Sequence, residues 1–256
     1  MSARGVFRFV VFMAVATVLA GCDDKKPAFY QGWVEADLIF VSPDEAGRVE
    51  TQAVKEGDHV EKGAPLFTLD AELQQADVMQ FDANVKNAMQ NLERARALLR
   101  TNAGTQKAFQ DAEETLRTAQ ARLNSAKTRL ARRRAVSPVS GSVQQIYFRP
   151  GEMVAAGKPV LALLPPENTK VRFYVPESLL PKLSLDAPIA VGCDGCPPDL
   201  AAHISFISRT AEYTPPVIYS LEERNKLVFL IEARPDRPDT LRVGQPVSVR
   251  IADNAS

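Results

Sequence analysis

Cys193 and Cys196, in the segment Cys193-Asp-Gly-Cys196, are the residues with the most reactive spacing in this chain of 256 residues. A Cys-x-x-Cys spacing can serve thiol–disulfide exchange, supply half of a zinc site, or close a loop as a disulfide. The surrounding pattern is not the strand–helix–strand arrangement of a thioredoxin-like protein. A four-coordinate zinc site lacks ligands, since His203 would be a third at best. A disulfide that closes a hairpin loop is the expected role.

The other polar residues suggest no catalytic centre. The two histidines, His59 and His203, are far apart in the sequence, and no nucleophile, carboxylate pair or phosphate-binding loop stands in an arrangement that supports a reaction. The chain has 31 basic and 31 acidic residues, so we expect no nucleic-acid-binding surface. We therefore predict that the protein is not an enzyme and carries no cofactor or metal.

The third cysteine, Cys22, follows an apolar N-terminal segment. Arg4 and Arg8 lie at the start of an apolar run over residues 6–20, which is short for a membrane span. The run ends in Leu19-Ala20-Gly21-Cys22, which resembles the lipobox of bacterial lipoproteins. This resemblance implies a signal peptide over residues 1–21 and lipidation of Cys22. An uncleaved membrane anchor is the alternative.

Asp23 resembles the inner-membrane retention signal of lipoproteins in enteric bacteria. The mature protein is then expected in the periplasm, anchored to the inner membrane by several acyl chains on Cys22, because one chain alone anchors only marginally. In that oxidising compartment Cys193 and Cys196 are expected to pair with each other.

The elements that position these residues begin with a repeat. Residues 47–69 recur without a gap as residues 141–163, so that Gly47 matches Gly141 and Leu69 matches Leu163. Each copy has the pattern of short strands separated by turns. Neither copy is long enough to bury a core alone, so we predict that the two complete one β-domain together.

The spacing of the repeat resembles the lipoyl-like, or barrel-sandwich hybrid, domain, here split into residues 46–70 and 137–166. Carrier versions of this domain present a lysine in the tight hairpin between the halves. In this chain residues 71–136 replace that hairpin, and no lysine occupies the expected turn. A lipoyl-type carrier is therefore disfavoured.

Residues 71–136 predict a long α-helical hairpin. Two heptad seams alternate steps of three and four residues, as a left-handed coiled coil requires, and Asn102-Ala103-Gly104 lies between them as the chain reversal. A helical insertion packed on its own domain would need wider apolar faces, so the narrow seams favour a free-standing antiparallel coiled coil. The seams are Val78, Phe81, Val85, Ala88, Leu92, Ala95 and Leu99, and Phe109, Ala112, Leu116, Ala119, Leu123, Ala126 and Leu130.

Four arginines, Arg129, Arg132, Arg133 and Arg134, crowd the end of the second helix. Basic residues there complement the helix dipole. We interpret them as capping and solubilising residues rather than as a binding patch.

The rest of the chain is predicted to be β. Residues 167–252 show short strands at near-regular spacing, as in a small antiparallel β-barrel. Residues 22–45 are expected to hold an anchor linker and a strand, Gly32–Ala36, that joins this barrel. The fold class is therefore mainly β with a long α-helical hairpin.

Arg94, Leu98 and Thr105 flank the predicted turn of the hairpin. Their spacing resembles the tip motif of HlyD-like membrane-fusion proteins, periplasmic adaptors that contact TolC-type outer-membrane channels. The resemblance implies that Arg94 and Thr105 make polar contacts with the channel and that Leu98 packs between channel helices. The alternative is a solvated helix end at which Leu98 shields the turn.

Residues 206–215, together with Arg224 and Leu227-Val228, are similar to adaptors of ABC-type exporters. The resemblance implies a subunit, six copies to the assembly, that links an inner-membrane ABC-type exporter to a TolC-type channel. Two alternatives stay open, an adaptor of a proton-driven multidrug pump and a scaffold lipoprotein without a transporter. The sequence ends at the barrel, so the membrane-proximal domain of larger adaptors is expected to be absent.

Overall fold

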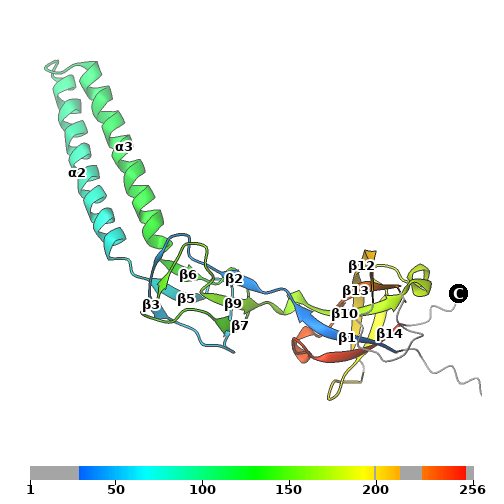
Figure 1. Cartoon of the computed structure of the whole chain (residues 1–256). Helices are drawn as coiled ribbons and strands as arrows, with labels where there is room; N and C mark the ends of the chain where they lie inside the picture. Colours follow the sequence, from blue (N-terminus) through cyan, green and yellow to red (C-terminus); the bar gives the residue numbers. More distant parts are fainter. Residues whose placement is uncertain (1–28, 199, 214–226, 252–256) are drawn as a thin grey trace, which may run out of the picture. The chain divides into compact units, whose positions relative to one another are not determined.

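The computed structural model describes residues 29–198, 200–213 and 227–251 (Figure 1). The predicted signal peptide, residues 1–21, and the predicted lipidation site Cys22 lie outside these residues. Residues 214, 215 and 224 of the segment that resembles ABC-exporter adaptors also lie outside them. The described residues divide into two compact units, one comprising residues 34–170 and 238–244 and the other comprising the remaining described residues.

The first unit is built from the two copies of the repeat, and equivalent segments form equivalent strands. The burial pattern of the first strand of one copy, alternately buried and exposed, recurs in the first strand of the other. Two short strands, β2 (Ile39–Val41) and β6 (Arg134–Val136), precede the copies. The copies themselves give β3 (Gly47–Gln52), β4 (His59–Val60) and β5 (Pro65–Leu69), and β7 (Gly141–Ile146), β8 (Met153–Val154) and β9 (Leu161–Leu164).

Neither copy completes a sheet by itself, because strands are exchanged between the copies. One four-stranded sheet has the order β2-β9-β7-β4, and the other has the order β6-β5-β3-β8. Thus β4 of the first copy pairs with β7 of the second, and β8 of the second pairs with β3 of the first. The prediction of one β-domain made from both halves is confirmed.

The hydrogen bonds between the copies are reciprocal. The Gly57 N–H donates to the Val143 carbonyl at 2.8 Å, and the Gly151 N–H donates to the Val49 carbonyl at the same distance. These are equivalent positions of the repeat. Gly57 and Gly151 have φ of 90° and 95°, a region that only glycine adopts without strain, which explains why both copies have glycine there.

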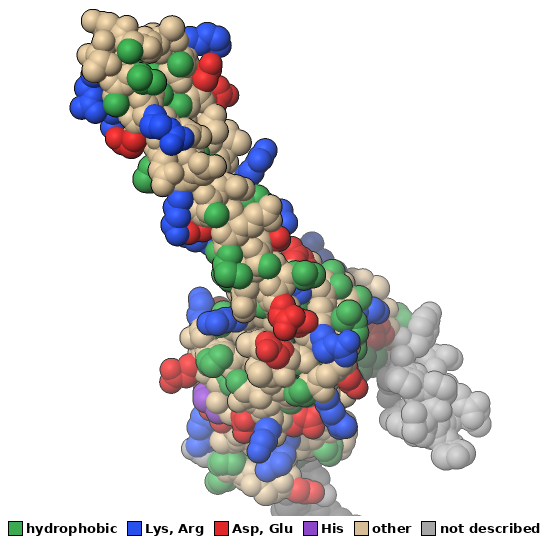
Figure 2. Space-filling view, turned by 90° about the vertical axis from the view of Figure 1, so that its left-hand side faces the viewer, with side chains coloured by type: hydrophobic (Ala, Val, Ile, Leu, Met, Phe, Trp, Pro, Cys, Tyr) green, Lys and Arg blue, Asp and Glu red, His purple; other side chains and the backbone are tan. Residues whose placement is uncertain are grey.

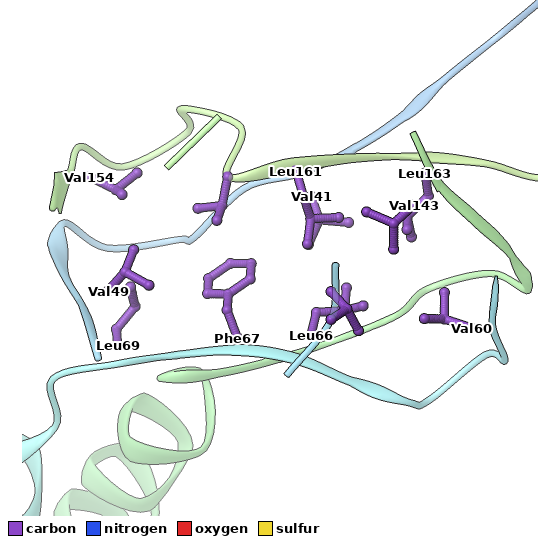
Figure 3. Packing of buried hydrophobic residues seen from close by; sticks show 12 residues of the cluster. Val41, Val49, Val60, Leu66, Phe67, Leu69, Val143, Val154, Leu161 and Leu163 are labelled. Carbon is purple, nitrogen blue, oxygen red and sulfur yellow. The ribbon is translucent and has the colours of Figure 1, made fainter. Parts of the chain in front are cut away.

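The hydrophobic core lies between the two sheets and takes side chains from both copies. Figure 3 shows Leu66, Phe67 and Leu69 of β5 on one side of it and Leu161 and Leu163 of β9 on the other. All five are at most 2% exposed. The full cluster is Val41, Val49, Val54, Val60, Leu66, Phe67, Leu69, Val143, Val154, Val160, Leu161 and Leu163.

Between β5 and β6 the chain forms two long helices, α2 (Glu72–Arg100) and α3 (Gln106–Ala131), which lie side by side (Figure 1). Every residue of the two predicted seams is buried or half-buried. The most buried are Ala88 and Leu92 of α2 and Leu123 and Ala126 of α3. The hairpin therefore uses its apolar side chains mainly between its own helices, and Figure 2 shows many charged side chains along its outside.

Within the described part of the chain, no helix has the length and apolar character that a membrane crossing requires.

The second unit is a closed barrel with the strand order β1-β10-β13-β12-β11-β14. Side chains of β10 alternate between buried and half-buried, and Val171, Phe173 and Val175 fill the interior with no exposed surface. A 3₁₀ turn covers residues 177–182 of this unit, and two others, over residues 166–168 and 238–240, lie in the first unit. The barrel strands are β1 (Phe29–Ala36), β10 (Thr169–Pro176), β11 (Pro188–Gly192), β12 (Ala201–Tyr213), β13 (Leu227–Pro235) and β14 (Pro246–Ile251).

The arginines after α3 differ among themselves. Arg132 forms an exposed ion pair with Asp44 at 3.3 Å. Arg133 is only 8% exposed and forms an ion pair with Glu45 at 3.1 Å. The interpretation as a capping and solubilising residue is therefore wrong for Arg133, because an acidic loop distant in the sequence folds against it.

Leu69→Ala and Leu163→Ala should each lower the free energy of unfolding by about 2–5 kcal/mol, because each leaves a cavity at an equivalent place in the shared core. Urea unfolding followed by circular dichroism measures the loss. Leu73→Ala, at a leucine that is 78% exposed, is the control and should change stability by less than about 0.5 kcal/mol. A large loss in only one core variant would contradict a core to which both copies contribute.

Candidate functional site

The turn that joins the two helices is folded back onto the last turn of α2. The Leu98 carbonyl accepts the N–H groups of Ala103 at 2.9 Å and of Gly104 at 3.1 Å. Asn102 has a φ of 54°, which asparagine tolerates better than most residues. A Cβ on Gly104 would lie 3.0 Å from the Leu98 Cβ. The turn therefore packs tightly against Leu98.

Leu98 is 50% exposed. One part of its side chain is covered by the turn and the other part faces solvent, so the residue both shields the turn and offers an apolar contact. Single exposed leucines are common on protein surfaces. The place of Leu98 at the end of a long hairpin, rather than its exposure, makes it a candidate.

Thr105 has a structural role that the sequence analysis did not assign. Its backbone is extended, and its hydroxyl oxygen accepts the Ala108 N–H at 3.1 Å, which makes it the N-cap of α3. A threonine directly before a helical pattern is the signal that could have revealed this. The hydroxyl hydrogen stays able to donate to a partner.

Arg94 lies four residues before Leu98, on the same side of α2. Its guanidinium donates to the Asn91 side-chain oxygen. The side chain is exposed. The structure thus places Arg94 and Leu98 on one face of α2 and sets Thr105 directly after the glycine that packs on Leu98.

A groove of about 590 Å³ runs between the helices on this face. Asn84, Asn87 and Asn91 of α2 line it, at spacings of three and four residues that continue to Arg94 and Leu98. Thr115 and Thr118 line it from α3, and the seam alanines Ala88 and Ala119 form part of its wall. This groove could not be predicted from the sequence, because it depends on which flank of each seam meets the other helix.

The opposite face of the hairpin is ionic. Asp82 and Lys86 form an ion pair at 2.8 Å, and the hydrogen bond from the Lys86 ammonium lowers the pKa of the Asp82 carboxyl. Glu93 and Arg96 form a second pair at 3.5 Å. The groove also has charged residues in its lining, namely Asp111, Glu114 and Arg122 of α3, so charged side chains occur on both faces of the hairpin.

Cys193 and Cys196 are joined by a disulfide in the loop between β11 and β12, with 5.2 Å between their Cα atoms. The Cys196 N–H donates to the Cys193 carbonyl at 3.1 Å, and the Gln245 amide lies 3.2 Å from the Cys193 Sγ. His203 is bound elsewhere, with Nε2 3.4 Å from Asp236. Across residues 29–198, 200–213 and 227–251, no three His, Cys, Asp or Glu side chains gather where they could hold a metal ion.

Thr105→Ala should loosen the start of α3 by about 1 kcal/mol, because the Ala108 N–H loses its acceptor. Amide hydrogen exchange at Ala108 should then be faster by a factor of about 5. Thr105→Ser keeps the hydroxyl and should exchange at the parent rate. Unchanged exchange in Thr105→Ala would show that the cap does not form in solution.

Comparison with known proteins gives a consistent family. Residues 38–164 match the barrel-sandwich hybrid domain of RND membrane fusion proteins. A UPF0194 membrane protein from Acidithiobacillus ferridurans is 34% identical over 173 residues, which cover 66% of this chain and 51% of that relative. This chain therefore spans about half the length of that relative.

Solved structures share the fold at low identity. The membrane fusion protein Spr0693 from Streptococcus pneumoniae R6 gives a TM-score of 0.68 at 17% identity, covering 88% of this chain and 99% of that one. A MacA-MexA chimera with the Pseudomonas aeruginosa MexA α-hairpin domain gives 0.69 at 18% identity, covering 89% and 83%. The domain match identifies residues 38–164 as a barrel-sandwich hybrid domain of the membrane fusion protein family, and the solved structures show that the fold is shared.

Proposed function

We propose that this chain is a periplasmic adaptor that links an inner-membrane ABC-type exporter to a TolC-type outer-membrane channel for efflux or secretion. The observation that carries the proposal is the half-exposed Leu98 at the turn of a two-helix hairpin, flanked by Arg94 and Thr105. The protein itself catalyses no reaction in this proposal. Its activity is to bring two membrane proteins together.

The hairpin has the reach that such a role needs. Its first helix has 29 residues, which at 1.5 Å per residue corresponds to about 43 Å. Because the apolar seams are used between α2 and α3, the hairpin needs no other surface to be stable along its length. This supports the coiled-coil hairpin of the sequence analysis and leaves the turn as the place where an apolar contact is offered.

The chemistry of the turn suits a helical partner. Leu98 supplies an apolar side chain, the Arg94 guanidinium supplies several N–H donors, and the Thr105 hydroxyl supplies one more. Together they can pack between two helices and donate to exposed backbone carbonyls or carboxylates at their ends. These are the contacts that the family resemblance assigns to a TolC-type channel.

The anchor and the assembly belong to the same proposal. Acyl chains on Cys22 would hold the protein at the inner membrane, and six copies would surround the path of the cargo. The barrel would contact the exporter through the region of β12 and β13, where residues 206–213 and 227–228 resemble ABC-exporter adaptors.

The name of the matched domain favours a second candidate. That domain is described for RND membrane fusion proteins, and RND transporters are proton-driven. An adaptor of a proton-driven multidrug pump is therefore the second candidate function.

Leu98→Asp should reduce photo-crosslinking between a probe at position 101 and the channel at least about tenfold, because a carboxylate cannot be buried without a partner in an apolar groove. Met89→Asp on the same helix is the matched control, since Met89 is 49% exposed and lies farther from the turn. It should retain parental crosslinking and export. If Leu98→Asp also retains both, the tip does not dock and the proposal is wrong.

Affinity purification of the full-length, detergent-solubilised protein should recover an ABC-type exporter as the main membrane partner. The measurement is mass spectrometry of the purified complex, with a strain that lacks the adaptor as the control. Recovery of a proton-driven pump would establish the second candidate instead. Recovery of no transporter would favour a scaffold lipoprotein and overturn the adaptor proposal.

A further inference from the structure

The base of the hairpin holds a buried arginine whose donors are almost fully used. The Arg133 guanidinium donates through Nη1 to the Ala46 carbonyl at 3.0 Å and through Nη2 to the Glu45 carboxylate at 3.1 Å. With the Gln74 amide turned so that its oxygen faces the guanidinium, Nε donates to that oxygen at 3.1 Å and Nη2 donates to it as well. We call Glu45, Ala46, Gln74 and Arg133 the Arg133 cluster.

The Arg133 cluster joins three segments that are distant in the sequence. Gln74 lies in the first turn of α2, Arg133 lies just after the end of α3, and Glu45 and Ala46 form the loop before β3. The Arg133 backbone carbonyl also accepts the Leu69 N–H at 2.8 Å, at the end of β5. Arg133, which lies at the end of the hairpin, therefore contacts the start of the hairpin and the loop before β3 with its side chain and contacts β5 with its backbone.

The β-domain leaves room for this guanidinium at one glycine. A Cβ on Gly47 would lie 2.6 Å from the Arg133 Nη1, which is closer than any unbonded contact allows. The equivalent Gly141 of the second copy is crowded by backbone instead, since a Cβ there would lie 2.5 Å from the Leu164 carbonyl oxygen. The glycine at position 47 thus makes space for the arginine.

The repeat provides an internal comparison for this ion pair. The position equivalent to Arg133 is Ile39, and the position equivalent to Glu45 is Val139. Both Ile39 and Val139 pack against the hydrophobic core. At these equivalent positions one pair of residues packs against the core, whereas the other pair, beside the base of the hairpin, forms an ion pair.

The two sets of residues differ in what they can bind. The Arg133 side chain is 10% exposed and the Glu45 side chain is 44% exposed, so the cost of removing charge from water falls mainly on Arg133. Replacing such a pair by apolar residues of similar size is often close to neutral for stability. The equivalent positions hold Ile39 and Val139, so the same arrangement of strands forms there without charged residues. What the apolar pair cannot do is hold the Gln74 amide of α2 by hydrogen bonds.

We propose that Arg133 is a positioning residue that fixes the direction in which the hairpin leaves the β-domain. Its contact with Gln74 ties the first turn of α2 to the same loop that receives the end of α3. The consequence for channel docking rests on the proposed function, because a hairpin free to pivot at its base presents Arg94, Leu98 and Thr105 in many directions.

The test compares two paired substitutions in the full-length chain. The variant Arg133→Ile with Glu45→Val copies the apolar pair of the other half. The matched control, Arg132→Ile with Asp44→Val, removes the neighbouring ion pair, whose side chains are 60% and 62% exposed. Spin labels on Glu61→Cys in the β-domain and Gln90→Cys in the hairpin, with Cys22→Ser, report their separation by pulsed electron paramagnetic resonance.

The parent and the control should each give one narrow distance distribution. The Arg133→Ile, Glu45→Val variant should lose that narrow distribution while it melts within about 4 °C of the parent. Gly47→Ala, which displaces the guanidinium without removing a charge, should broaden the distribution as well. A narrow distribution in both the paired variant and Gly47→Ala would overturn the proposal. A melting temperature of the paired variant well below that of the control would also overturn it, because the ion pair would then mainly stabilise the fold.

Channel crosslinking separates this inference from the proposed function. Leu98→Asp should reduce crosslinking at least about tenfold and leave the distance distribution unchanged. Arg133→Ile with Glu45→Val should weaken crosslinking and broaden the distance distribution. If neither Leu98→Asp nor Arg133→Ile with Glu45→Val changes crosslinking, while the second variant still broadens the distance distribution, the docking function is wrong and the positioning role of Arg133 stands.

Discussion

The exchange of strands between two incomplete half-domains is the interaction on which this unit of the protein depends. Each copy of the repeat supplies one short strand, β4 or β8, to the sheet of the other, and one side of a core that neither copy could close. The reciprocal hydrogen bonds of Gly57 and Gly151 fix the register of this exchange. Because the two halves must meet, whatever the chain carries between them has to leave the domain and return to it.

A helical hairpin satisfies that requirement. Its seams are buried between α2 and α3, so it adds length without a further domain to pack on. The hairpin must then be fixed at its base, where the start of α2, the end of α3 and a loop of the β-domain lie together. The planar guanidinium of Arg133 joins these segments, because it donates hydrogen bonds in several directions at once. The equivalent positions elsewhere in the repeat are Ile39 and Val139, which pack against the core.

Much of this could be predicted from the sequence because the signals are local and periodic. The gapless repeat gave the split domain, and steps of three and four residues gave both seams. The role of Thr105 as a cap was also local and could have been found. Arg133 could not, since its partners Glu45 and Gln74 are brought to it only by the folded β-domain. The groove beside Ala88 and Ala119 is of the same kind, because it depends on how one helix is rotated against the other.

The sequence by itself determined the two half-domains, the hairpin between them and the residues at its turn, since each follows from spacing along one segment. The tertiary structure alone decided which of several similar arginines is buried, which face of the hairpin is grooved and which glycine makes space for a side chain. The physical reason is that burial of a charge depends on partners from distant segments. A repeat predicts that two halves meet, and only the folded domain shows that Arg133 and Glu45 form an ion pair where the equivalent Ile39 and Val139 pack against the core.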